Sequence, residues 1–233
     1  MDLNTLITKL QAIKALGFVK THRAHDTGIG KTLEDLLEIK ENNLRLPDIG
    51  EIELKAKRVD SGSMLTLATK SPLPRGVNKI LFEKNKYLDR EGHYNLHSTV
   101  YGSRPNKQNL QIVFEGDRLV LKNGHNIEAY WPVSIFDDVL RSKSDKVLLV
   151  LAETEGERKT ESEAFHYVEA HLLSQMNIEK FKKAIEEDKL KIDIRIGAYR
   201  TGKNQGKYHD HGTGLRISKR DYLQLFDKEE KLI

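Results

Sequence analysis

The chain has 233 residues, which at roughly 100–200 residues per domain corresponds to one large domain or two small ones. It contains no cysteine, so disulfides, thiolate zinc sites, iron–sulfur clusters and cysteine nucleophiles are excluded, and a reducing cytoplasm is a fitting location. With 38% hydrophobic and 32% charged residues it has the composition of a soluble globular protein. No apolar run approaches the ~20 residues that cross a bilayer, so we expect no membrane association.

The charge is unevenly distributed along the chain. Residues 54–107 hold 11 Lys/Arg against 4 Asp/Glu, and residues 195–220 hold 7 against one. These two stretches carry +13, so the other residues must carry −9 to give the net charge of +4. Basic stretches on an otherwise acidic chain indicate a face that binds a polyanion. Charge alone leaves a solvated surface as the alternative.

Hydrophobic periodicity in the first half predicts two helices followed by two strands. The helices are expected over residues 3–16 and 31–42, with a loop over 18–30 between them. Period-two alternation predicts a strand from Glu51 to Lys57, and the next strand is expected over 64–69. Residues 70–107 are irregular apart from a strand at 97–101.

The second half mixes strands and helices. We expect a hairpin of 110–114 and 119–121 around Gly116-Asp117, a strand over 126–131, and a short helix capped by Ser134. A buried strand over 146–152, a helix from Asn177, a strand over 190–196, a loop over 198–214 and a helix over 218–226 follow. The order predicts an α/β or α+β fold with a mixed central sheet flanked by helices. The stretches 58–107 and 198–214 are expected to form two arms of a cleft.

The segment Gly28-Ile29-Gly30-Lys31-Thr32 is similar to a phosphate-binding loop. That loop needs an earlier glycine where this chain has His25, so nucleotide hydrolysis is not favoured. A glycine loop that starts a helix, with amides near a phosphate, fits the segment better.

A carboxylate–lysine constellation at residues 48–55 carries the chemical prediction. Glu53 and Lys55 are two apart on a predicted strand, so they point to the same face. Asp48 precedes the strand, where a turn can bring its carboxylate beside Glu53. Two adjacent acids repel unless a cation lies between them, and Mg²⁺ prefers one or two carboxylates plus waters and phosphate oxygens. Lys55 would hold the attacking water or a phosphoryl oxygen, as phosphodiester hydrolysis requires.

The alternative for this segment is a solvated charged face, which Glu51 and Lys57 would extend. The position of the motif at a boundary between acidic and basic sequence favours the catalytic interpretation. Glu34, on the preceding helix, is a further acid that could close on the site.

Several segments together resemble the MvaI/BcnI family of type II restriction endonucleases, which is related to the repair nickase MutH within the PD-(D/E)xK nuclease fold. The segments are Gly28 to Glu34, Glu41-Asn42-Asn43, Pro47-Asp48, Ile52 to Arg58, Leu65 to Lys70, Pro74-Arg75-Gly76 and His209 to Ile217. The resemblance spans about residues 20–226, and the last segment looks like the BcnI side of the family.

The resemblance implies a set of catalytic residues. Asp48 and Glu53 would bind the metal together with the backbone carbonyl of Leu54, Lys55 would be the catalytic lysine, and Glu34 would support the metal centre. The implied cofactor is Mg²⁺, with Ca²⁺ supporting binding without cleavage. Either Lys143 or Lys146 lies where MutH has a further lysine, and the sequence does not choose between them.

The resemblance also implies double-stranded DNA as the partner, at a short CC-N-GG-like site, for a monomer that cuts the two strands in turn. His209, Asp210 and His211 would read bases in the major groove, with His211 at the central pair. The alternatives for the two histidines are a solvated loop and an adventitious metal pair. The other residues assigned to DNA are Arg200, Lys203, Lys207, Arg216, Lys31, Lys57, Arg58, Lys70 and Arg75.

We therefore expect a type II site-specific deoxyribonuclease of the prokaryotic cytoplasm, leaving 5′-phosphate ends and accompanied by a cognate DNA methyltransferase. It would be a single endonuclease domain, divisible into a catalytic lobe over about 1–150 and a recognition lobe over about 151–233. A MutH-like nickase and a non-cleaving DNA-binding module are the alternatives. The target sequence, its central base and the overhang are not fixed by the sequence.

Overall fold

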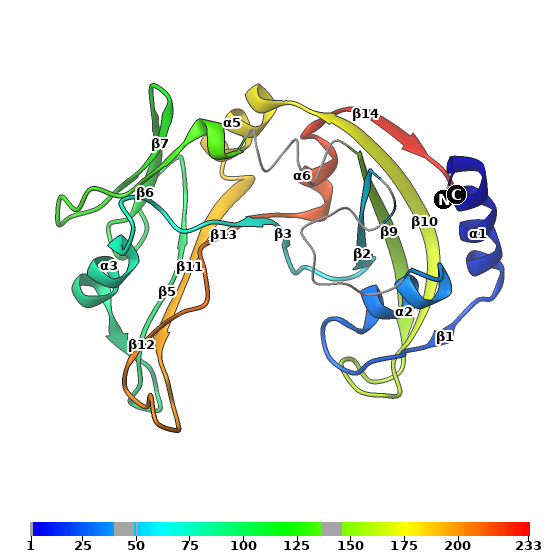
Figure 1. Ribbon diagram of the computed structural model, residues 1–233, viewed down its shortest axis with the longest axis horizontal. Coiled ribbons are helices and arrows are strands. Elements are labelled where there is room, and N and C mark those ends of the chain that lie inside the picture. Colours follow the sequence, from blue (N-terminus) through cyan, green and yellow to red (C-terminus); the bar gives the residue numbers. More distant parts are fainter. Residues whose placement is uncertain (1, 40–48, 50, 137–145) are drawn as a thin grey trace. The chain divides into compact units, whose positions relative to one another are not determined.

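The computed structural model of the chain describes residues 2–39, 49, 51–136 and 146–233 (Figure 1). The chain divides into two compact units. The first unit comprises Met1–Ser63, Val139–Asn177 and Phe226–Ile233, and the second comprises Met64–Asp138 and Ile178–Leu225. The lobe boundary expected near residue 150 falls inside a strand of the first unit, Lys146–Glu155.

The first unit is built on a five-stranded sheet. Its elements are α1 (Leu3–Ala15), β1 (Val19–Lys20), α2 (Gly28–Leu36), β2 (Ile52–Arg58), β9 (Lys146–Glu155), β10 (Ala164–Met176) and β14 (Phe226–Lys231). The strand order is β1-β10-β9-β2, and β14 also pairs with β10. Strand β2 runs parallel to β9, whereas the other pairs are antiparallel, so the sheet is mixed.

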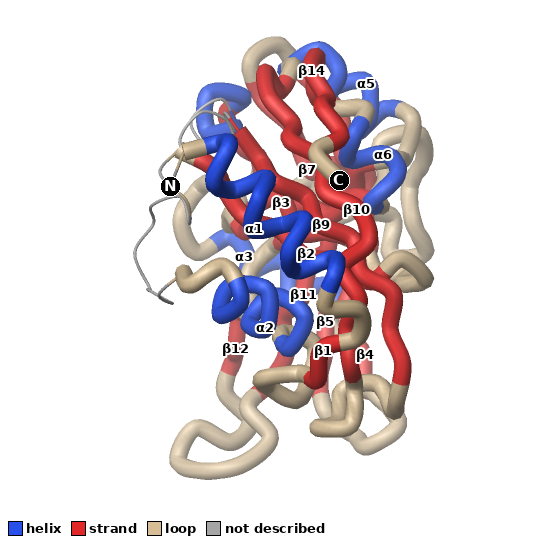
Figure 2. Tube along the Cα trace, turned by 90° about the vertical axis from the view of Figure 1, so that its right-hand side faces the viewer, coloured by secondary structure: helices blue, strands red, loops and turns tan. Residues whose placement is uncertain are grey.

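Helices α1 and α2 cover one face of this sheet, and Figure 2 shows both lying across its strands. Each helix contributes a stripe of buried residues at helical spacing, Leu6, Leu10 and Ile13 from α1 and Ile29 and Leu33 from α2. The same core takes alternate side chains of the strands, namely Leu148, Val150 and Ala152 of β9 and Ile52, Leu54 and Ala56 of β2. The residues between them on β2 therefore point to the other face.

The second unit contains a six-stranded and a three-stranded antiparallel sheet. Its elements are β3 (Leu65–Thr69), α3 (Val77–Asn85), β4 (Tyr87–Leu88), β5 (Tyr94–Val100), β6 (Gln111–Glu115), β7 (Arg118–Lys122), β8 (Tyr130–Pro132), α5 (Ile178–Glu186), β11 (Leu190–Ala198), β12 (Tyr208–Asp210), β13 (Gly214–Ile217) and α6 (Lys219–Leu223). The larger sheet has the order β3-β13-β11-β5-β4, with β12 also on β11, and the smaller has β6-β7-β8.

Strand β11 gives the larger sheet one apolar and one polar face. Leu190, Ile192, Ile194 and Ile196 are buried, and helices α3 and α5 pack against this strand. Lys191, Asp193 and Arg195 alternate with them and are only half-buried. The polar face is thus a consequence of strict period-two alternation.

The predicted fold class is confirmed as a mixed α+β fold, and most of the predicted strands are present. The structure differs from the prediction at several elements. Helix α2 begins at Gly28, not Lys31; α3 was not predicted; and the last helix ends at Leu223 and is followed by strand β14. The long strand β10 was also missed, as was β12, which lies within the predicted loop over 198–214. Helix α2 ends at Leu36, not at Asn42, and the end of the helix predicted from Ser134 lies outside the described residues.

Among the residues described, no helix is long and apolar enough to span a bilayer.

Candidate active site and nucleic-acid interface

The acid–lysine pair lies on β2, on the face opposite the helices. Glu53 and Lys55 are separated by 3.5 Å from Oε1 to Nζ, and their side chains are 15% and 18% exposed. In the parallel pairing with β9, Glu53 lies beside Val147 and Lys55 beside Leu149, both of which are buried. An ion pair flanked by apolar side chains is poorly screened by water. The weak screening increases the electrostatic interaction of Glu53 and Lys55 with any charged group that approaches them.

Leu54 lies between the two functional residues, with its side chain in the core on the other face. Asp48 lies outside the described residues, but the next residue, Ile49, is buried. The backbone of Ile49 exchanges two hydrogen bonds with that of Ile52, 3.0 and 2.8 Å long. The chain that follows Asp48 is therefore tied directly to the first residue of β2.

Glu34 is half-buried on α2, which packs against β2. The Glu34 carboxylate bends back over the first turn of its helix, because a Cβ atom added to Gly30 would lie 3.9 Å from its Oε1 atom. The helix N-terminus carries a partial positive charge that stabilises an anion there. Burial, with a contribution from the Glu34 charge, raises the pKa of Tyr167, whose hydroxyl donates to the Ile29 carbonyl oxygen at 2.8 Å.

Of the two candidate assisting lysines, Lys143 lies outside the described residues. Lys146 begins β9 beside Ile52, so it is at the end of β2 at which the chain arrives from Asp48. Its ammonium lies 3.4 Å from the Glu51 carboxylate.

The basic residues assigned to DNA in the first unit have intramolecular partners. Lys31 lies 2.7 Å from Asp35, and Lys57 donates to the Ser63 hydroxyl at 2.6 Å. Arg58 makes a bidentate pair with the buried Glu163, at 2.6 and 2.8 Å. This bidentate geometry indicates that the Arg58 guanidinium supports the fold.

In the second unit, the structure places His209 and His211 side by side on the polar face of the larger sheet. Their ring centroids are 4.1 Å apart, and the His209 ring stacks on Tyr199 at 4.2 Å. Burial lowers the pKa of His211, with further contributions from His209, His97 and Arg195. A neutral imidazole has one donor and one acceptor nitrogen, as base recognition requires.

Asp210 lies between the two histidines in sequence but on the opposite side of the strand. Its carboxylate accepts hydrogen bonds from Asn78, Tyr208 and the Gly212 amide. Arg200 pairs with Glu91 at 2.9 Å and with Asp89 at 3.5 Å. Asp210 thus faces away from the surface that carries the two histidines, whereas the Arg200 side chain is 58% exposed.

The remaining predicted residues of this unit lie at three places. Lys203 is exposed in the loop before β12, and Lys207 donates to Asn204 at 3.3 Å in the same loop. Arg75 is exposed just before α3, and the backbone of Lys70 is bonded to Thr213. Arg216 contacts Asp193 at 3.3 Å on the polar face.

Arg195 is the functional candidate that the sequence analysis missed. It lies on the polar face of β11, where it pairs with His97 of β5, and its backbone carbonyl accepts from the His211 amide at 2.9 Å. The Nε atoms of Arg195 and Arg216 are both buried and have no hydrogen-bond partner in the described part of the chain. The signal was present in the alternation of Lys191, Asp193 and Arg195, but only the apolar residues of this strand had been used.

A hollow of about 420 Å³ adjoins this polar face. One side of the hollow is formed by His97 and Thr99 of β5 and by Tyr101, which follows this strand. Another side is formed by the loop that contains Arg104 and Lys107. Arg104 lies over the Tyr101 ring at 5.3 Å, and Lys191 lies 5.5 Å from the same ring. Cationic groups beside an aromatic ring suit a nucleic-acid backbone.

Within the described residues, one other group has the donors for a metal ion, Asp89, Glu91 and His93. Its acids already have partners, because Asp89 accepts from two backbone amides and from Asn95, and Arg200 pairs with both carboxylates. These contacts are typical of a tight turn, so we attribute the group to the turn between β4 and β5.

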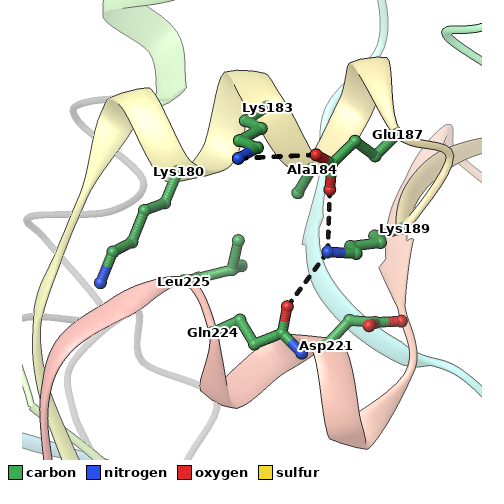
Figure 3. A pocket seen from close by; sticks show the side chains of 8 residues that line it. All are labelled: Lys180, Lys183, Ala184, Glu187, Lys189, Asp221, Gln224 and Leu225. Carbon is green, nitrogen blue, oxygen red and sulfur yellow. Dashed lines mark hydrogen bonds and ion pairs between the residues drawn. The ribbon is translucent and has the colours of Figure 1, made fainter.

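A second hollow, of about 170 Å³, lies between α5 and α6 (Figure 3). Glu187 pairs with Lys189 at 2.8 Å and with Lys183 at 3.7 Å, and Lys189 also donates to Gln224. None of the residues that line this second hollow is assigned to catalysis or to DNA binding.

The mixed α+β fold class is that of a restriction endonuclease. The sequence profile described as the MvaI/BcnI restriction endonuclease family matches residues 7–226, and the chain belongs to this family.

Two solved structures of MvaI are similar to the chain, each at 34% sequence identity. The complex of restriction endonuclease MvaI with its cognate DNA substrate has a TM-score of 0.82 and covers 100% of both chains. The structure of MvaI in the absence of DNA has a TM-score of 0.60 and covers 100% of this chain and 99% of that one. A search of curated protein sequences gives no match.

Proposed function

We propose that this endonuclease is a Mg²⁺-dependent enzyme that hydrolyses DNA at a short CC-N-GG-like site and leaves 5′-phosphate and 3′-hydroxyl ends. The observation that carries the proposal is the Glu53–Lys55 pair, 3.5 Å apart beside an apolar strand, in a chain similar over its full length to a restriction endonuclease solved with DNA. By family membership we also expect it to act in the prokaryotic cytoplasm beside a cognate methyltransferase.

The donor set fits a divalent metal. Glu53 would supply a carboxylate that is mostly shielded from water, and the Leu54 carbonyl would be a second ligand. Asp48, which lies outside the described residues, is proposed from the family as the source of a second carboxylate. Oxygen ligands of this kind suit Mg²⁺. The bound ion would lower the pKa of a water and neutralise charge on the phosphate.

In the hydrolysis that we propose, a water oxygen attacks phosphorus and the bond from phosphorus to the 3′ oxygen breaks. Lys55 orients the attacking water and offsets the charge that develops on the phosphoryl oxygens. The 3′ oxygen takes up a proton, and the 5′ side retains the phosphate. The role of Glu34 in supporting the metal centre is proposed from the family alone, because α2 packs on the face of the sheet opposite Glu53 and Lys55.

The recognition surface that we propose is the polar face of the second unit. Among the described residues, Arg195 and Arg216 each have a buried Nε with no hydrogen-bond partner. Both side chains lie near Gly214, Arg195 with its guanidinium and Arg216 with its methylene groups, while the Arg216 guanidinium contacts Asp193 and the Met64 carbonyl oxygen. Arginine pairs with guanine in the major groove, and each bidentate pair contributes about 1–3 kcal/mol of discrimination. His211 would read the central base pair, and Lys203 and Lys207 would contact phosphates.

The test is digestion of supercoiled plasmid by the purified full-length chain with Mg²⁺, followed by sequencing of the ends. Linear products with one set of 5′-phosphorylated ends would support the proposal. Nicking alone, dependent on an added protein, would favour a MutH-like repair enzyme. Site-specific binding without any cleavage in Mg²⁺ would leave a DNA-binding module.

A further inference from the structure

The rear side of strand β12 is held by a partly buried polar network. Successive side chains of a strand point to opposite faces, so Asp210 faces away from His209 and His211. Asp210 pairs with Ile196 in the sheet, on the apolar face against which α3 packs. A charged residue on an apolar face needs a specific reason to be there.

Four hydrogen bonds define the network. Asn78 of α3, which is 4% exposed, donates from Nδ2 to Asp210 Oδ2 at 2.8 Å and to the Thr213 hydroxyl at 3.3 Å. The Tyr208 hydroxyl donates to Asp210 Oδ2 at 3.2 Å, and the Gly212 amide donates to Oδ1 at 2.7 Å. Burial, together with the Asp210 charge, raises the pKa of Tyr208, so its hydroxyl remains a donor at neutral pH.

The network also fixes the turn after the histidines. Gly212 has a φ of +86°, and a Cβ atom there would lie 2.4 Å from Thr69 Cγ2. Thr213 is 1% exposed, and its carbonyl accepts from the Lys70 amide at 2.9 Å. The Asp210 carboxylate therefore connects helix α3, strand β12 and a turn that has little room to shift.

The arrangement leaves one atom of Asn78 without compensation. Both N–H groups of its amide are used, but Oδ1 is buried and has no hydrogen-bond partner among the described residues. An unsatisfied buried acceptor costs about 1–3 kcal/mol. The two hydrogen bonds that the amide donates to Asp210 and Thr213 give a specific reason for this buried polar side chain.

We propose that Asn78 is a positioning residue that, through Asp210, holds the His209 and His211 rings in register with a DNA base pair. The inference rests on the proposed function, because it assigns the support of the same reading surface. Asp210 then acts from behind the strand and does not contact the bases. On the front, the His209 ring is stacked on Tyr199, and the His211 amide is bonded to Arg195, so a shift of β12 would move both rings.

The experiment compares Asn78→Ala with Asn123→Ala in the full-length enzyme. Asn123 is the matched control because its amide donates two hydrogen bonds, at 3.0 and 2.8 Å, that hold the turn between β7 and β8 of the same unit. The readout is the ratio of cleavage rates on the cognate site and on sites with one base pair replaced, measured in Mg²⁺, together with the melting temperature.

We expect Asn78→Ala to lower the discrimination ratio by about tenfold at the base pair affected by His211→Ala. Asn123→Ala should lower the melting temperature without changing the ratio. Asp210→Asn keeps the size of the side chain but presents an amide to Asn78. It should reproduce the loss, and the double variant should be no worse than either single variant.

An unchanged ratio in a folded Asn78→Ala or Asp210→Asn enzyme would overturn the inference while leaving the endonuclease proposal intact. A cleavage rate that falls by the same factor on the cognate site and on every altered site, in step with the melting temperature, would show a purely structural role like that expected of Asn123. This outcome would also overturn the inference. A wild-type enzyme that shows no site-specific cleavage would overturn the proposed function and the inference with it.

Discussion

At the scale of single residues, the environment separates charged groups of the same type into different roles. Lys55 and Arg58 lie on one strand, but Lys55 borders an apolar row beside Glu53, whereas Arg58 is bonded to Glu163 through two nitrogens. The side chain of Arg58 is 11% exposed, and its guanidinium has the geometry of a structural partner. The sequence assigned Arg58 to DNA because charge alone cannot show which partner is nearby.

Removing the carboxylate of Glu53 tests the active site. Glu53→Gln should lower the cleavage rate by about 10²–10³-fold or more, because an electrostatic group aimed at developing charge contributes that much. DNA binding in Ca²⁺ should persist. Single-turnover cleavage and gel-shift assays provide the measurements. Glu51→Gln, on an 83% exposed neighbour, is the control and should cleave at the wild-type rate. Full activity in Glu53→Gln would remove the proposed metal site.

Removing one partner of the Arg58–Glu163 pair should destabilise the protein. Arg58→Met leaves the 1% exposed Glu163 without its main cation, which costs about 3–5 kcal/mol for a buried pair. Arg158→Met breaks an exposed pair with Asp60 and should cost about 0–1 kcal/mol. Urea unfolding at pH 7 measures both changes. Equal effects of the two variants would contradict a structural role for Arg58.

The same pair predicts a pH dependence. Burial raises the pKa of Glu163, but the Arg58 and Lys159 hydrogen bonds more than offset it, so the net direction is below the ordinary value of 4.5. A carboxyl group with a lowered pKa stabilises the fold above its unfolded pKa, and this stabilisation is lost as the pH falls through the folded value. The difference in unfolding free energy between wild type and Glu163→Gln should therefore be largest near neutral pH and shrink below about pH 4.5. A difference that grows on acidification would contradict this sign.

At the scale of elements, α2 shows why glycine misled the helix prediction. Gly28 and Gly30 suggested a loop, yet both are helical. Gly28 is needed for close approach, because a Cβ atom there would lie 2.2 Å from the Arg23 carbonyl oxygen. Gly30 has no such neighbour, and the nearest atom to its added Cβ is 3.9 Å away.

These two glycines form a matched pair of variants within one helix. Gly28→Ala should destabilise the protein by about 1–3 kcal/mol, because backbone atoms must move to admit the methyl group. Gly30→Ala should be neutral or stabilise by about 0.5–1 kcal/mol, because alanine has the higher helix propensity. Thermal or urea unfolding distinguishes them. If Gly30→Ala destabilised the protein more than Gly28→Ala, the backbone of the loop before α2 would be able to move and admit the methyl group at little cost.

Elements with a clear period could be predicted from the sequence. Helix α1 and strands β2 and β11 follow from apolar residues at spacings of 3–4 or 2, and the face shared by Glu53 and Lys55 followed from the same rule. Helix α3 could not be found this way, because its buried residues include Asn78, whose partners Asp210 and Thr213 lie over 130 positions away. The opposite roles of His211 and Asp210 likewise depend on which side of β12 faces α3.

At the scale of the whole molecule, a small net charge of +4 conceals the strong asymmetry between basic and acidic stretches. Affinity for DNA depends on the local basic groups, since each phosphate contact releases counterions. The site residues that we assign to phosphates and to bases should therefore respond differently to salt.

The corresponding prediction compares Lys203→Gln with Arg195→Met. Log affinity should fall linearly with log salt, and Lys203→Gln should reduce that slope by about one while leaving sequence preference unchanged. Arg195→Met should lower the preference for the cognate site by about 1–3 kcal/mol. Binding titrations between low and moderate salt, on cognate and altered duplexes, measure both. A changed sequence preference in Lys203→Gln would contradict the assignment of Lys203 to phosphates.

The interleaving of the two units has a consequence for biosynthesis. The first unit is assembled from three separate stretches, and its strand β14 follows the whole of the second unit in the chain. Before β14 is translated, residues 171–176 of β10 lack the strand that pairs with them in the folded protein. The core also lacks Leu232 and Ile233. Contacts between distant parts of a chain form late and slowly. A nascent polypeptide on the ribosome would thus hold a first unit whose sheet lacks its β14 strand, so under the proposed function DNA cleavage would begin only after synthesis has passed Phe226.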